Sequence, residues 1–107
     1  MNTQFKKGII ELCVMKIVSR KDMYGFEVID TISKEIEVNE NTIYPILRRL
    51  TKQDYFETYK ESMSIGAPRK YYKLTKLGEE KLLEAENEWT SFLESVSRVL
   101  GGIKNEE

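Results

Sequence analysis

The sequence contains no histidine, and its one cysteine, Cys13, lies in an apolar run between Leu12 and Val14. Such a setting suits a small buried hydrophobe better than a reactive thiol. The sequence also lacks a glycine-rich phosphate loop and any set of residues at metal-ligand spacing. It therefore predicts a protein that is not an enzyme and that uses no metal or cofactor.

Long apolar runs are missing too, because no stretch approaches the roughly 20 residues needed to cross a bilayer. The start of the chain leads into a short apolar run that Glu11 and Lys16 interrupt, and no small-residue cleavage site of a signal peptide follows. Together with the single cysteine, these absences favour a cytoplasmic protein without a membrane partner.

The net charge is only −1 over 107 residues, but this average hides a strong asymmetry along the chain. Residues 41–76 contain eight Lys or Arg against three acidic side chains, which gives +5. Residues 77–107 contain three against eight, which gives −5, and residues 1–40 contribute −1. The basic middle of the chain indicates a localised positive surface, as nucleic-acid binding requires.

The length suits one compact domain with a modest core. Apolar spacing predicts a first helix over residues 5–19 and a second from about Tyr24 to Glu35, with Ser19 or Asp22 as its candidate N-cap. Gly25 lies near the start of the second helix, where glycine has no steric need. We therefore expect it to permit a close approach of another part of the chain.

The stretch from Asn39 to Lys52 predicts a third helix, with Asn39 as its N-cap. At about 100° per residue, one face collects four apolar side chains: Ile43, Ile46, Leu47 and Leu50. Because this spacing continues past Pro45, we expect the helix to continue through the proline. The opposite face gathers amide, hydroxyl and guanidinium groups, which can contact bases and phosphates in a major groove. An ordinary amphipathic surface helix would show the same spacing.

Strand-forming residues follow over 55–75, in two runs separated by a loop from Ser62 to Pro68. They predict a β-hairpin in which basic and aromatic residues interleave, the basic ones being Lys60, Arg69, Lys70 and Lys73. A solvated edge hairpin can also carry lysines, which deter aggregation. Because the hairpin directly follows the candidate DNA-contacting helix, we interpret it as a wing that touches DNA.

A last helix is predicted from about Lys76 to Leu100, with Thr75 as its cap. Its apolar residues recur in steps of three and four, as in a coiled-coil seam: Leu82, Ala85, Trp89, Phe92, Val96, Val99 and Ile103. This seam can pack back on its own domain or pair with a second copy. Because so long a helix would overhang a small domain, we expect a homodimer.

These elements predict a mainly α fold with a small β-hairpin, of class α+β. Residues 1–75 would form a winged helix-turn-helix DNA-binding domain, and residues 76–107 a coiled-coil-like dimerisation helix with a short tail. The alternative is a coiled-coil module that binds a protein and no DNA. The basic hairpin of residues 59–73 argues against it, since an adaptor has no need for positive charge on both a helix face and a neighbouring ribbon.

The sequence resembles the PadR-like family of transcriptional regulators, in particular its small subgroup with a single C-terminal helix. Three blocks carry the resemblance, in family order and spacing: Met23 to Val28, Asn41 to Leu50, and Gly66 to Thr75 with Gly78. The resemblance implies a bacterial repressor that binds double-stranded operator DNA of palindromic sequence as a homodimer.

The resemblance also implies release by small-molecule effectors. In several small members, planar apolar compounds enter a cavity between the two subunits, against a Trp whose position Trp89 matches. On the sequence alone, Phe92 follows Trp89 along the seam, and the first helix can supply side walls through Ile9, Leu12 and Met15. A Trp packed as ordinary dimer core is the alternative.

The predicted DNA-binding residues lie on the third helix, at the start of the second and on the hairpin: Tyr24, Asn41, Thr42, Tyr44, Pro45, Arg48, Arg49, Lys60, Arg69 and Lys70. Asn41 and Arg48 are candidates for base-edge contacts, and Arg69 and Lys70 for wing contacts. The others on the third helix would position it on the phosphate backbone.

Overall fold

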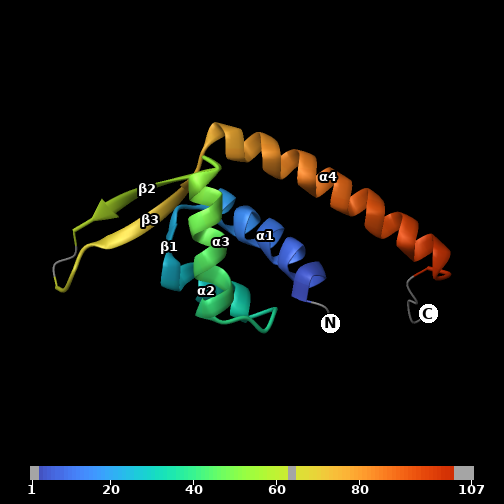
Figure 1. Cartoon of the computed structure of the whole chain (residues 1–107), viewed down its shortest axis with the longest axis horizontal. Helices are drawn as coiled ribbons and strands as arrows, with labels where there is room; N and C mark the ends of the chain where they lie inside the picture. The colour runs from blue at the N-terminus through green and yellow to red at the C-terminus, as the bar shows by residue number, and fades with distance from the viewer. Residues whose placement is uncertain (1–2, 63–64, 103–107) are drawn as a thin grey trace.

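The computed structural model describes residues 3–62 and 65–102 of the chain. In these residues, four helices and three strands follow one another in the order α1 (Thr3–Arg20), β1 (Met23–Tyr24), α2 (Gly25–Ser33), α3 (Glu40–Lys52), β2 (Phe56–Glu61), β3 (Arg69–Leu74) and α4 (Lys76–Val99). Figure 1 shows α1, α2 and α3 gathered beside the sheet, with the β2–β3 hairpin and α4 extending away from them. The predicted α+β class is confirmed, and so are the hairpin and the helix through Pro45.

The sheet has three antiparallel strands in the order β1-β3-β2. β2 and β3 form the predicted hairpin, in which Phe56 is opposite Leu74 and Glu61 is opposite Arg69. β1, which the sequence analysis did not predict, pairs Met23 with Tyr72 and Tyr24 with Tyr71. Two residues are too few to show the period-2 pattern of a strand, so only the pairing with β3 defines β1.

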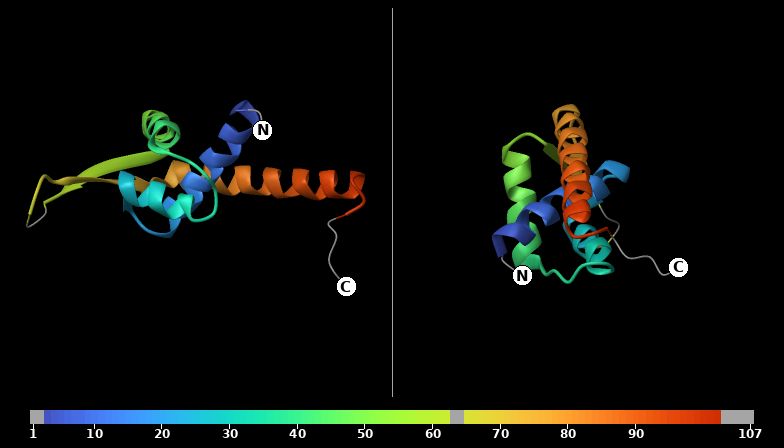
Figure 2. Two further views of the ribbon diagram at one scale, coloured as in Figure 1. Left: turned by 90° about the horizontal axis from the view of Figure 1, so that it is seen from below. Right: turned by 90° about the vertical axis from the view of Figure 1, so that its right-hand side faces the viewer.

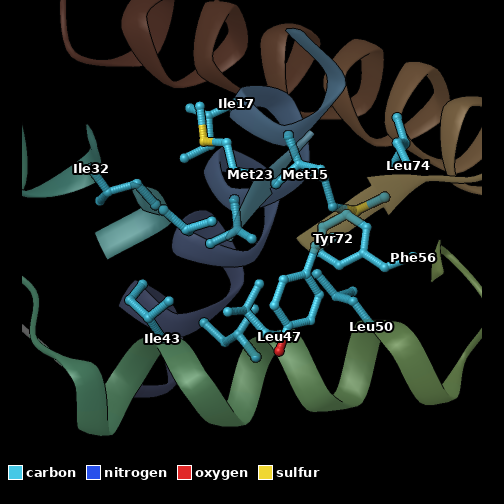
Figure 3. Close-up of a cluster of buried hydrophobic side chains, with 14 of the residues drawn as sticks. Met15, Ile17, Met23, Ile32, Ile43, Leu47, Leu50, Phe56, Tyr72 and Leu74 are labelled. Carbon is cyan, nitrogen blue, oxygen red and sulfur yellow. The ribbon is translucent and has the colours of Figure 1, made fainter. Parts of the chain in front are cut away.

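The apolar stripe of α3 forms one side of the core. Ile43, Ile46 and Leu47 are completely buried, and Leu50 nearly so. In Figure 3, the side chains of Ile43, Leu47 and Leu50 point from α3 into the cluster that contains Phe56, Tyr72 and Met15. Each fully buried side chain of this size contributes on the order of 1.5–3 kcal/mol. The predicted core face of this helix is therefore confirmed.

α1 forms the opposite side of the core and packs against α2, β3 and α4. Its buried residues occupy much of the helix circumference: Ile10, Val14, Met15, Ile17 and Val18. Cys13 is half-buried, and burial raises the pKa of its thiol. A higher pKa leaves less reactive thiolate at neutral pH, in line with the structural role predicted for this cysteine.

Side chains cap two of the helices as predicted. Asn39 Oδ1 accepts a hydrogen bond from the backbone N–H of Asn41 at 2.9 Å, and Thr75 Oγ1 accepts one from the N–H of Gly78 at 2.9 Å. The prediction for α2 is wrong, because the residue before this helix is Tyr24, whose own N–H donates to Glu27 Oε1 at 3.2 Å. The intervening strand β1 separates Ser19 and Asp22 from the start of α2.

α4 begins in the core and then leaves it. Gly78 and Leu82 are buried, and Lys16 of α1 pairs with Glu86 at 3.0 Å. Beyond this point α4 projects from the rest of the chain, on the side opposite the hairpin (Figure 2), and Phe92 and Val99 are 54% and 84% exposed. Leu82 was predicted to lie in the dimer interface. This prediction is wrong, because only 7% of Leu82 is exposed and it packs in the core of its own chain.

Ile103, the last residue of the predicted seam, lies outside the described residues. Within residues 3–62 and 65–102, none of the helices combines the length and apolar character needed to cross a bilayer.

Gly78 allows α4 to start directly against Tyr55, in the connection between α3 and β2. A Cβ at this position would overlap the carbonyl oxygen of Tyr55 and lie 2.7 Å from Leu74 Cδ1, whereas a Cβ on Gly8 of α1 would meet nothing within 4 Å. We expect Gly78→Ala to lower the free energy of unfolding by about 1–3 kcal/mol through overpacking. Gly8→Ala is the matched control and should raise it by roughly 0.5–1 kcal/mol through helix propensity. Chemical denaturation of both variants measures the difference. Equal stabilities would contradict the close packing at Gly78.

Candidate nucleic-acid interface

The apolar face of α3 is buried in the core, and the opposite face is uncovered. Asn41 and Arg48 on this face are exposed, while Thr42, Tyr44 and Pro45 are half-buried along it. Burial raises the pKa of the Tyr72 hydroxyl, and Tyr44 raises it further. The guanidinium of Arg48 lies close enough to Tyr72 to oppose this rise. The uncovered face of α3 therefore lies beside β3, the central strand of the sheet.

Arg49 does not lie where the sequence interpretation placed it. Its guanidinium lies against the carboxylate of Glu11 on α1, and about a third of its side chain is exposed. Neighbouring residues of a helix point about 100° apart, so Arg49 faces the flank of α3 while Arg48 faces outward. The interpretation that Arg49 shares the outward face with Arg48 is wrong, because an acidic partner on α1 lies along that flank.

The hairpin carries an unbalanced positive charge on one face. Across the two strands Glu57 is opposite Lys73 and Glu61 is opposite Arg69, so these charges balance. Lys60, in contrast, is opposite Lys70, and both are exposed. Like charges directly opposite one another are unfavourable in a sheet, and an anion between them would relieve the repulsion.

The two lysines share a face with buried core residues of the hairpin. Side chains along a strand alternate between faces, so Lys70 lies on the same face as Tyr72 and Leu74. Tyr72 and Leu74 pack in the core beneath α3. The uncompensated charge therefore lies on the side of the hairpin that adjoins α3.

The other face of the sheet carries a row of three tyrosines that sequence analysis missed. Tyr59 stacks on Tyr71 with ring centroids 5.5 Å apart, and Tyr71 meets Tyr24 edge-on at 5.5 Å. These residues are direct cross-strand partners. Their alternation within the hairpin was visible in the sequence, but the third member depends on β1.

A hydrogen bond anchors this row to the segment before β1. The hydroxyl of Tyr59 donates to Asp22 Oδ2 at 2.7 Å. This bond is the main reason that the pKa of Tyr59 rises to about 12. The phenol therefore keeps its proton throughout the physiological range, and the bond ties the hairpin to the body of the domain.

Gly25 permits the close approach that its place in the sequence predicted. A Cβ at this position would lie 2.6 Å from Cε1 of Tyr44 and 3.0 Å from its hydroxyl oxygen. The ring of Tyr44 therefore rests on the first residue of α2, which sets the distance between α2 and α3. Tyr24, directly before Gly25, contacts the hairpin through its ring.

The predicted effector residues fall in two places. Leu12 and Met15 line a groove of about 280 Å³ between α1, α3 and α4, together with Glu11, Arg49, Lys81 and other residues. Ile9 is half-buried on α1, one turn before Leu12 and Cys13. Trp89 and Phe92 lie further along α4 with ring centroids 6.1 Å apart, and they do not line this groove. One chain therefore does not bring the two groups together.

Of the predicted dimer residues other than Leu82, Ala85 lines the groove between α1, α3 and α4, and the others lie along the projecting part of α4. Ala85, Trp89 and Val96 are half-buried, and Phe92 and Val99 are exposed. In the described part of the chain, no three His, Cys, Asp or Glu side chains gather as metal ligands would.

Comparison with known proteins agrees with this architecture. The structure of a PadR-like transcriptional regulator from Bacillus cereus superposes with a TM-score of 0.84 at 34% identity, covering 94% of this chain and 100% of the other. A PadR family transcription regulator from Clostridium difficile superposes with a TM-score of 0.76 at 30% identity, covering 87% and 98%. An uncharacterized protein of Lysinibacillus sphaericus is 30% identical over 102 residues, which are 92% of this chain and 94% of that protein.

The family comparison covers both the helices and the wing. The model of the transcriptional regulator PadR-like family matches residues 14–84, from the middle of α1 to the first turns of α4. Members of this family regulate transcription and bind DNA, and they are not enzymes. With its winged helix-turn-helix fold and this match, the chain belongs to the PadR-like family of transcriptional regulators.

Proposed function

We propose that this protein is a repressor that binds a palindromic operator as a homodimer in the cytoplasm. The observation that carries the proposal is the continuity of two surfaces. The uncovered face of α3, with Asn41 and Arg48, adjoins the hairpin face on which Lys60 and Lys70 are opposite one another. Amide and guanidinium groups suit base edges, while a pair of lysines on a ribbon suits the phosphate backbone.

Specificity and affinity are assigned to different residues in this proposal. Arg48 is the candidate for bidentate contact with guanine and Asn41 for contact with adenine, which are the pairings that the geometry of these side chains favours. Lys60, Lys70 and Arg69 would release counterions from phosphates without reading sequence. Arg49 is left out of the interface, because its guanidinium is held by Glu11.

Binding to the DNA upstream of the protein's own gene tests this division. Arg48→Ala should cost about 1–3 kcal/mol on the preferred site and relax the sequence preference. Lys70→Ala should weaken binding to all duplexes alike and make it depend less steeply on salt. Fluorescence anisotropy over a range of salt concentrations measures both effects.

Arg98→Ala is the matched control, because Arg98 is exposed near the end of α4 and donates a hydrogen bond to Ser95 of its own helix. Equal affinity of the unmodified protein for operator and random duplex, without a footprint, would refute the operator. It would instead favour the coiled-coil module that binds a protein.

The projecting part of α4 supports the proposed homodimer. Its apolar side chains recur on one face beyond Ala85, and Phe92, Leu93 and Val99 are exposed. A large exposed apolar face on a helix typically marks an interface. In this proposal residues 76–107 act as the dimerisation helix, although its first two turns also complete the core of the domain formed by residues 1–75. A two-fold axis would place two copies of α3 about one helical turn of DNA apart.

Val96→Asp tests the dimer. Val96 is half-buried on the apolar face of α4, and in the interface its aspartate would be a buried charge without a partner. Sedimentation should show a monomer, and operator affinity should fall by about tenfold or more, because the two copies of α3 are no longer linked. Ser91→Asp places the same charge on the opposite side of α4 and should leave the dimer intact. A dimeric Val96→Asp protein would exclude this face as the interface.

We further propose that a planar apolar molecule enters between Trp89 residues of the two subunits and releases DNA. Trp89 and Phe92 are neighbouring aromatic rings tilted by 36° on the projecting part of α4. Large rings that meet at a two-fold axis fill space poorly, and the gap suits a flat apolar ligand. Within one chain, Trp89 does not line the groove that contains Leu12 and Met15. In this proposal the side walls of the ligand site, formed by Ile9, Leu12 and Met15, therefore come from α1 of the partner.

Trp89 is the only tryptophan, so its emission reports this site directly. Titration with planar aromatic dyes should quench it with saturation, and DNA should dissociate over the same concentration range. Trp89→Phe removes this emission, so dye binding to the variant is followed by the fluorescence of the dye itself; it should be weaker, while DNA binding stays intact. Quenching that leaves DNA affinity unchanged would show that Trp89 is ordinary dimer core.

A further inference from the structure

A notch of about 240 Å³ lies between the start of α2, the ring of Tyr44 on α3 and the outer end of β3. It is lined by Tyr24, Gly25, Phe26, Tyr44, Arg69, Lys70 and Tyr72. β1 pairs with β3 only as far as Tyr71, so the edge of β3 is open where Lys70 and Arg69 follow. The notch therefore forms where the sheet edge and the two helices of the helix-turn-helix meet.

Two cations lie in this notch, and each lies over an aromatic ring. The guanidinium carbon of Arg69 is 4.3 Å from the centroid of the Tyr24 ring, and Nζ of Lys70 is 5.7 Å from that of Tyr72. Arg69 adopts this position although Glu61 is its cross-strand partner. A cation over a ring keeps its N–H groups free at the edge. None of the described residues that line the notch carries a carboxylate.

A hydroxyl group is held at the same place. Because Gly25 has no side chain, the ring of Tyr44 rests on the start of α2, with its hydroxyl oxygen 3.0 Å from where a Cβ of residue 25 would be. Tyr44 is half-buried, so its position is defined by packing. The notch thus combines two cations with a positioned hydroxyl donor.

Phe26 adds an apolar surface at the rim. It is 61% exposed at the second position of α2, where it contributes little to the core. A cation pair beside an exposed apolar ring matches a phosphodiester with its adjoining sugar, whose carbon atoms are apolar. Inorganic phosphate would use only the cations and the hydroxyl.

We propose that this notch binds one phosphodiester group of the DNA backbone in each half-site. Arg69 and Lys70 neutralise its charge, the hydroxyl of Tyr44 donates a hydrogen bond, and Tyr24 and Tyr72 act as positioning residues that hold the two cations. Gly25 is required because any side chain there would displace Tyr44. The proposal rests on the proposed DNA-binding function and assigns one specific contact within it.

The test replaces single phosphates of the footprinted duplex, one at a time, by neutral methylphosphonates. With the unmodified protein, one position in each half-site should lower affinity by about tenfold, the size of one charge-assisted contact. With Arg69→Ala the same substitution should cost less than about twofold, because the contact is already gone. Tyr44→Phe removes only the hydroxyl. With this variant, the methylphosphonate at the sensitive position should lower affinity less than it does with the unmodified protein, and the effect of methylphosphonates elsewhere should be unchanged.

Lys73→Ala is the matched control, since Lys73 is an exposed cation of the same strand and faces Glu57. It should retain the full loss at the sensitive phosphate. Gly25→Ala should behave like Tyr44→Phe, while circular dichroism verifies that each variant is folded.

Three outcomes would overturn the assignment. If DNA binds but no position shows a loss that depends on Arg69, the notch is not a backbone contact, and the proposed DNA-binding function stands without it. If inorganic phosphate releases DNA more strongly than chloride does at equal ionic strength, and Arg69→Ala abolishes this difference, the notch binds a free anion. If no DNA binds at all, both proposals fail together.

Discussion

Burial of the apolar stripe of α3 is the contact on which the rest of the structure depends. Ile43, Ile46 and Leu47 are fully enclosed and Leu50 nearly so, at spacings of one, three and four residues. Anchors along about two turns of the helix fix its rotation, because turning it would expose one of them to water. Once the rotation is fixed, Asn41 and Arg48 must face outward. The packing of the core therefore determines which polar groups are presented.

The register of the hairpin determines the charge of the wing in a similar way. Residues 56–61 pair with 69–74 so that Glu57 is opposite Lys73 and Glu61 is opposite Arg69, whereas Lys60 is opposite Lys70. A shift by one residue would move side chains to the other face, so that Phe56 and Tyr72 would leave the core and charged neighbours such as Glu57 and Lys73 would enter it. The apolar face thus selects the register, and the register concentrates positive charge beside α3. The hydrogen bond from Tyr59 to Asp22 holds the wing in this direction.

α1 connects the two functional ends of the molecule. It packs between α2, β3 and α4, its Glu11 contacts Arg49 of α3, and its Lys16 pairs with Glu86 of α4. Surface ion pairs contribute little free energy, so the buried side chains of α1 supply most of the rigidity between α4 and α3. A movement of the projecting part of α4 relative to a partner would be transmitted to α3 mainly through this helix. The second half of α4, which carries Glu88 and Glu94, points away from the hairpin (Figure 2), and this keeps the charge of these two residues distant from the basic surface.

The sequence by itself determined the helices, the hairpin, the caps at Asn39 and Thr75 and the core face of α3, because each follows from local periodicity or from one side chain and a nearby N–H. It also indicated the role of Gly25, since a glycine inside a helix needs a reason. The tertiary structure alone decided the facts that depend on what lies across from a residue. Arg49 contacts Glu11 on α1 and therefore does not lie on the outward face of α3. Leu82 packs in the core of its own chain, and Met23 and Tyr24 form a strand because they pair with β3. The notch of Arg69, Lys70 and Tyr44 belongs to the same class, because its residues are separated along the chain and only the packing of α2 against α3 and the sheet brings them together.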